Sequence, residues 1–131
     1  MKNNKIFYYL LAGVLGIVSI VLPTLFMTDL RQFNAPLFPI IRTAIEGIST
    51  WSFGLLLFSG FCLKWFSNLS SWKIGFATLA FFPIMAVLEI FIDSSSHNML
   101  PFEFVLYAVY SIPAIVGAYL AEGIKLALGN K

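Results

Sequence analysis

The chain has 131 residues, of which 60% are apolar and only 11% are charged, and its formal net charge is +2. Its mean hydropathy is +0.90, whereas an average soluble domain is about half apolar and a quarter charged. This composition excludes a soluble globular domain, a disordered chain, a nucleic-acid-binding domain and, with one cysteine, a disulfide-stapled secreted module. We therefore expect an integral membrane protein whose surroundings are the lipid bilayer, with no nucleic-acid partner and no cofactor.

Four apolar stretches follow one another along the chain, at about residues 6–27, 44–66, 72–92 and 102–124. Each has about the 20 residues that a helix needs to cross the hydrocarbon layer, and only helices satisfy every backbone group within one segment there. Lys2 and Lys5 precede the first stretch as in a signal peptide, but its apolar run is too long and no cleavage site follows, so we expect a retained span. The sequence predicts an all-α, single transmembrane domain over residues 1–131, an antiparallel four-helix bundle.

The outer connection between the first two stretches is unusual. Pro36 and Pro39 interrupt it, and Leu37, Phe38 and Ile40 are too apolar for a solvated loop. An irregular segment, or a short helix lying in the membrane interface, is expected here.

Two prolines lie near the middle of the third and fourth stretches. Pro83 and Pro113 each deprive a carbonyl four residues earlier of its N–H partner, at Leu79 and Val109. The sequence predicts a kink in each helix.

The distribution of charge predicts the orientation. If the N-terminus is inside, six cations lie on the inner side and two on the outer side, which satisfies the positive-inside rule. The inner lysines are Lys2, Lys5, Lys64, Lys73, Lys125 and Lys131, and the outer arginines are Arg31 and Arg42. We expect a multi-pass protein of the cell membrane with both termini in the cytoplasm.

Most other charged groups, and the single histidine, gather at the predicted outer face. This candidate polar cluster comprises Asp29, Arg31, Arg42, Glu46, Glu89, Asp93, His97 and Glu103. Glu89 stands out because acids inside a span are costly and rare. It is interpreted either as a carboxylate that carries a proton or binds a ligand, or as a hydrogen-bond partner of a neighbouring helix.

Helical spacing suggests three further arrangements at this face. Arg42 and Glu46 are four residues apart and would form an ion pair. Glu89, Asp93 and His97 would share one stripe if the helix continued, and could bind a divalent cation or form a general base, although three serines before His97 favour a turn. Arg31 and Arg42, near Asp29, would either anchor the chain at the interface or hold a lipid phosphate.

Small residues at a spacing of four mark surfaces for close helix packing. These are Ala12 with Gly16, Ala114 with Ala118, and Gly117 with Ala121. The spacing does not distinguish contacts within the chain from contacts with a partner.

Three functions fit the sequence. The main hypothesis is a non-enzymatic accessory, protective or assembly protein that acts through contacts with a membrane-protein partner or a second copy of itself. The alternatives are an oligomeric proton- or ion-coupled transporter or channel subunit that uses Glu89, and an outer-leaflet enzyme that uses Glu89, Asp93 and His97.

Overall fold

A computed structural model describes residues 4–27, 34–95 and 100–129. Within these ranges the chain is helical over 82% of its residues and contains no strand. Seven helices follow in the order α1 (Lys5–Phe26), α2 (Pro39–Glu46), α3 (Thr50–Phe66), α4 (Ser71–Leu79), α5 (Phe81–Ile92), α6 (Leu100–Tyr110) and α7 (Ile112–Ala127). The all-α prediction is confirmed.

Three segments are long and apolar enough to cross a membrane. They are α1, the pair α4–α5 over Ser71–Ile92, and the pair α6–α7 over Leu100–Ala127. The bent pair α2 and α3 makes a fourth if it is counted as one span. These features support a membrane protein with three to four spans.

The predicted second span differs from the structure at its start. Instead of one helix from residue 44, α2 ends at Glu46 and α3 begins at Thr50, at an angle of 99°. Gly47 follows α2, and the Ser49 hydroxyl accepts a hydrogen bond from the Ser52 N–H at 3.2 Å, which caps a new helix. Glu46, Gly47 and Ser49 interrupt the apolar sequence here and divide it into two helices.

Both predicted kinks coincide with helix breaks. α4 ends at Leu79 and α5 begins after Ala80. α6 ends at Tyr110 and α7 begins after Ser111. Each break lies just before the proline that removes a backbone donor, Pro83 or Pro113. The Ser111 N–H donates to the Tyr107 and Ala108 carbonyls at 3.1 and 3.3 Å, so the chain turns without leaving this donor unsatisfied.

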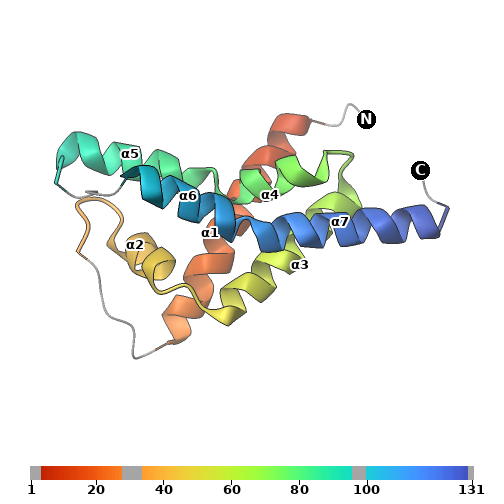
Figure 1. The fold of residues 1–131 in the computed structure, drawn as a ribbon, viewed down its shortest axis with the longest axis horizontal. Coiled ribbons are helices and arrows are strands. Elements are labelled where there is room, and N and C mark those ends of the chain that lie inside the picture. The colour runs from red at the N-terminus through yellow and green to blue at the C-terminus, as the bar shows by residue number, and fades with distance from the viewer. Residues whose placement is uncertain (1–3, 28–33, 96–99, 130–131) are drawn as a thin grey trace.

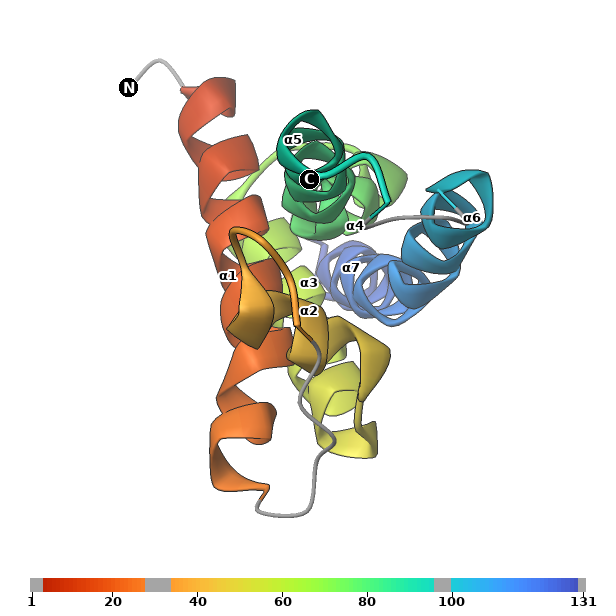
Figure 2. The same cartoon turned by 90° about the vertical axis from the view of Figure 1, so that its left-hand side faces the viewer.

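The helices are not all aligned (Figures 1 and 2). The pairs α4–α5 and α6–α7 run along the long axis of the molecule, and α1 crosses them steeply. α7 packs most extensively against α3, while α1 lies against α3 and α4. The antiparallel bundle and the orientation of the termini stay predictions.

At one end of the molecule, which we call the lysine end, polar contacts join four helices. The Tyr8 hydroxyl donates to the Phe66 carbonyl at 3.0 Å. Lys64 Nζ lies 3.4 Å from the Glu122 carboxylate, which also accepts a hydrogen bond from the Ser71 hydroxyl. These contacts bring together the start of α1, the end of α3, the start of α4 and the end of α7.

Candidate functional site

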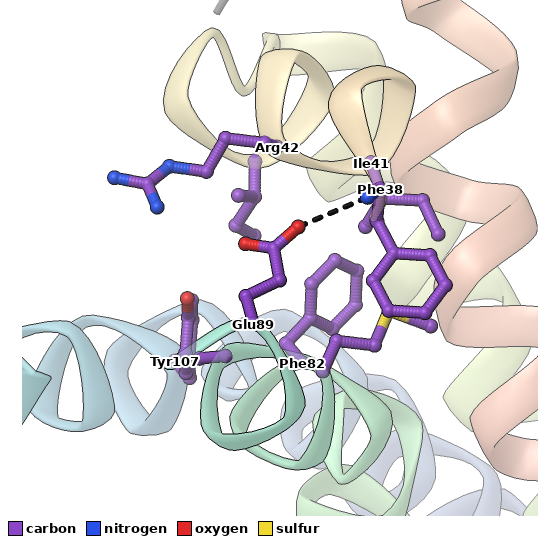
Figure 3. A pocket seen from close by; sticks show the side chains of 9 residues that line it. Phe38, Ile41, Arg42, Phe82, Glu89 and Tyr107 are labelled. Atoms are coloured by element: carbon purple, nitrogen blue, oxygen red, sulfur yellow. Dashed lines mark hydrogen bonds between the residues drawn. The ribbon is translucent and has the colours of Figure 1, made fainter. Parts of the chain in front are cut away.

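Glu89 lies in the last turn of α5 and points toward the first turn of α2 (Figure 3). Glu89 is only 3% exposed, and its Oε1 accepts a hydrogen bond from the Phe38 N–H at 2.9 Å. Phe38 is the residue before α2, so the carboxylate serves a backbone donor that the helix itself leaves unsatisfied. A negative charge at this position is also favoured by the helix dipole.

Arg42, on α2, connects two further acids. Its Nε lies 3.1 Å from Glu46 Oε1 on the same helix, and its Nη2 lies 3.7 Å from Glu103 Oε1 on α6. The Tyr107 hydroxyl donates to the other oxygen of Glu103 at 3.3 Å. Together with Glu89, these residues form what we call the carboxylate cluster: three acids, one guanidinium and one phenol on α2, α5 and α6.

A small cavity adjoins the cluster. Its volume is about 20 Å³, and Glu89, Arg42 and Tyr107 line it together with apolar side chains such as Phe82. Such a volume accommodates about one water molecule, and the polar lining offers that water several hydrogen-bond partners. The chemistry available in this cavity is therefore the binding of one water or the movement of a proton at Glu89, with no room for an organic substrate.

Asp93 lies apart from Glu89 although it follows one helical turn later. α5 ends at Ile92, and the extended backbone of Asp93 carries its exposed side chain out of the helix. The Asp93 carboxylate accepts hydrogen bonds from the Ser95 hydroxyl at 2.7 Å and the Ser95 N–H at 2.9 Å. These bonds, the hydroxyl first, lower the pKa of Asp93 because they stabilise its charged form.

The remaining predicted outer residues are Asp29, Arg31 and His97, and they lie outside the described residues. No group of three histidine, cysteine, aspartate or glutamate side chains within the described part of the chain is arranged to hold a metal ion. The stripe of Glu89, Asp93 and His97 stays a prediction, but its requirement that α5 continue beyond Ile92 is not met at Asp93.

The predicted packing residues are buried within the chain itself. Ala12, Gly16, Ala114, Gly117, Ala118 and Ala121 all lie in helix contacts. A Cβ added to Gly16 would stand 1.6 Å from the Thr78 carbonyl oxygen, and one added to Gly117 would stand 1.9 Å from the Leu57 carbonyl oxygen. These glycines allow backbones to touch, and their small surfaces are already occupied by this chain.

Sequence reasoning did not identify two of the polar arrangements. The Phe38 N–H as partner of Glu89 follows from where α2 starts, and Pro39 at the first helical position was the available signal. The contact of Glu122 with Lys64 and Ser71 joins residues about fifty positions apart. The feature of the sequence that could have indicated this contact was Glu122 itself, a single acid among the lysines of the predicted inner side.

Comparison of the chain with protein-family models, with curated proteins and with solved structures finds no match.

Proposed function

We propose that the chain is a small multi-pass protein of the cell membrane that acts through contacts of its exposed helix faces with another membrane protein or a second copy. In this proposal it is a single domain whose four spans alternate in direction, with both termini in the cytoplasm. The clustering of lysines supports that orientation, since Lys64 and Lys125 meet at one end while Arg42 lies with the carboxylate cluster.

The carboxylate cluster supports action at an outer surface rather than at an internal reactive site. The charged members of the cluster have contacts within the chain: Glu89 with the Phe38 N–H, and Arg42 with Glu46 and Glu103. Matched groups of this kind hold helices in place. The adjoining space for about one water leaves a substrate no room beside them.

The observation that carries the proposal is the exposure of the α5–α6 arm. In Figure 1 this pair of helices extends to the left of the other long helices, and its contacts with them are sparse. Large apolar side chains cover both helices and are exposed, including Ile84, Phe91, Phe102, Val105 and Val109. Apolar side chains on α1 and α7 are exposed as well, but the sparse contacts of α5 and α6 with the rest of the chain make this arm the face that we assign to a protein partner.

Photocrosslinking in native membranes tests the partner contact. We replace Val109 on α6 by p-benzoylphenylalanine and use the same replacement of Val18 on α1 as the matched control, since the two residues are 48% and 46% exposed. Position 109 is expected to give a discrete protein adduct, and position 18 only lipid adducts. Lipid adducts alone at both positions, or equal protein adducts at both, would contradict the proposal.

A second candidate, proton-coupled transport, is favoured by one observation: a buried carboxylate beside a water-sized cavity. Glu89 would be the titrating group. Liposomes carrying a pH gradient test this function with wild type and Glu89→Gln. A protein-dependent flux that disappears in the variant supports transport, and the absence of any flux in wild type removes it.

A further inference from the structure

An apolar groove runs between α1 and the α4–α5 pair, away from the carboxylate cluster. Its volume is about 350 Å³, and its lining includes Tyr9 and Gly13 on α1 and Ala77 and Ala80 on the other wall. The small side chains of Ala77 and Ala80 leave room on one wall beside the break between α4 and α5, while the Phe81 ring packs against Gly13 on the other. In a bilayer such a furrow is filled by an apolar chain, because water has no hydrogen-bond partners there.

Two lysines do not line the groove themselves, but each lies one helical turn before one of its lining residues, on either wall. Lys5 shares a helical stripe with Tyr9 and Gly13, and Lys73 shares a stripe of α4 with Ala77 and Ala80, because residues three or four apart lie on the same face. The two walls start from the lysine end of the molecule, where the first turn of α1 is bonded to the last residue of α3, a few residues before α4. Both cations therefore belong to the same membrane interface.

These lysines differ from the other lysines of the described residues. Lys64 pairs with Glu122, and Lys125 donates to the Lys64 carbonyl at 2.9 Å. Among residues 4–27, 34–95 and 100–129, no ion pair or hydrogen bond satisfies the ammonium of Lys5 or Lys73. Lys73 Nζ only lies over the adjacent tryptophan ring, 5.3 Å from its centroid. Two exposed cations thus face the interface without an acid of their own.

We propose that this groove binds an anionic phospholipid. One acyl chain lies along the small residues of the groove, and the headgroup phosphate lies between the ammonium groups of Lys5 and Lys73. The apolar groove binds an acyl chain, and the two lysines favour a negatively charged headgroup over a zwitterionic one. The second groove, between α4–α5 and α6, is likewise lined without charged side chains, but its α6 wall carries no lysine, so it makes no such selection.

Native mass spectrometry of the purified full chain tests the proposal, with phosphatidylglycerol and phosphatidylcholine of identical acyl chains as probes. Wild type is expected to retain phosphatidylglycerol preferentially. The double variant Lys5→Gln/Lys73→Gln is expected to bind it about thirtyfold more weakly, since each lysine near an anionic headgroup contributes about fivefold. Lys125→Gln, which removes a lysine away from the groove, is the control and keeps the preference.

A second pair of variants tests the groove itself. Ala77→Leu places a larger side chain in the proposed groove alone and is expected to abolish retention of both lipids at this site, whereas Ala108→Leu makes the same change in the other groove and leaves phosphatidylglycerol binding intact. Melting of the lipid-free variants at the wild-type temperature shows that they fold. Equal binding of the two lipids by wild type, or an unchanged preference in the lysine double variant, would overturn the proposal. So would a lipid-free dimer that Ala77→Leu dissociates, because a second copy would then occupy the groove.

Discussion

Along their crossings, α1, α3, α4 and α7 meet through glycines laid against backbone carbonyls, whereas α2, α5 and α6 meet through an arginine and three carboxylates. The first kind of contact depends on the absence of side-chain volume. The second depends on charge and leaves space, as the water-sized cavity shows. The comparison indicates that the closely packed part of this protein is specified by shape and the carboxylate cluster by electrostatics.

The largest expected effect comes from adding one methyl group to the closely packed half. Gly117→Ala would place a Cβ 1.9 Å from the Leu57 carbonyl oxygen, which requires the helices to separate. We expect the free energy of unfolding to fall by about 3 kcal/mol, at the upper end of the usual cost of overpacking. Reversible unfolding in mixed micelles measures this change.

The matched control is Gly54→Ala on α3, where no atom lies within 4 Å of an added Cβ. In a helix, alanine is favoured over glycine by about 0.5–1 kcal/mol, so stability is expected to stay constant or rise slightly. Equal losses in both variants would mean that backbone contact is not what holds these helices together.

An intermediate effect is expected at Glu89. Glu89→Leu leaves the Phe38 N–H without its acceptor and is expected to lower the free energy of unfolding by about 2 kcal/mol, within the range for hydrogen bonds to charged groups. Glu89→Gln keeps an acceptor oxygen and is expected to lose about half of that. Thermal melting in detergent measures both, with Glu46→Gln as a control whose more exposed ion pair contributes about 0.5 kcal/mol.

A higher melting temperature for Glu89→Gln than for wild type would reverse this interpretation. The carboxylate would then reduce stability, as groups kept for binding or proton transfer often do. That result would favour the transport candidate over a purely structural role for the carboxylate cluster.

The smallest effect concerns the exposed Asp93, where charge acts without burial. Ser95→Ala removes the hydroxyl that is the main cause of the lowered pKa of Asp93, so the pKa is expected to rise toward its ordinary value. Because the folded-state pKa is depressed, the stabilising contribution is present above the ordinary pKa and is lost as the pH falls through the lowered value. Titration of the Asp93 carboxyl carbon by NMR measures the shift, and an unchanged pKa in the variant would contradict the role of the hydroxyl.

The sequence predicted the helical spans well where hydropathy decided them. The stretches at 6–27 and 72–92 coincide within a residue or two with α1 and with α4–α5, and Pro83 and Pro113 marked both internal breaks. The second span was not divided correctly, because residues 44–66 are apolar on average while the turn at Gly47 and the cap at Ser49 act locally. Periodicity alone therefore missed the 99° bend.

The candidate site was predictable only in its composition. Arg42 and Glu46 follow from their spacing along one helix, and the structure places them 3.1 Å apart. The approach of Glu89 to the Phe38 N–H, and of Arg42 to Glu103, depends on how three helices are arranged in space. A pattern along one chain carries no information about such distances, so the sequence identified the charged groups but not their partners.

The bend between α2 and α3 also affects the surrounding bilayer. α3 has 17 residues and is about 25 Å long, whereas the 28 residues of α6–α7 extend over about 42 Å, and a hydrocarbon core is about 30 Å thick. The lipid layer beside α3 is expected to become thinner. The longer α6–α7 segment carries Glu122 and Lys125 in its last turns, so the protein presents hydrophobic faces of unequal length to the bilayer.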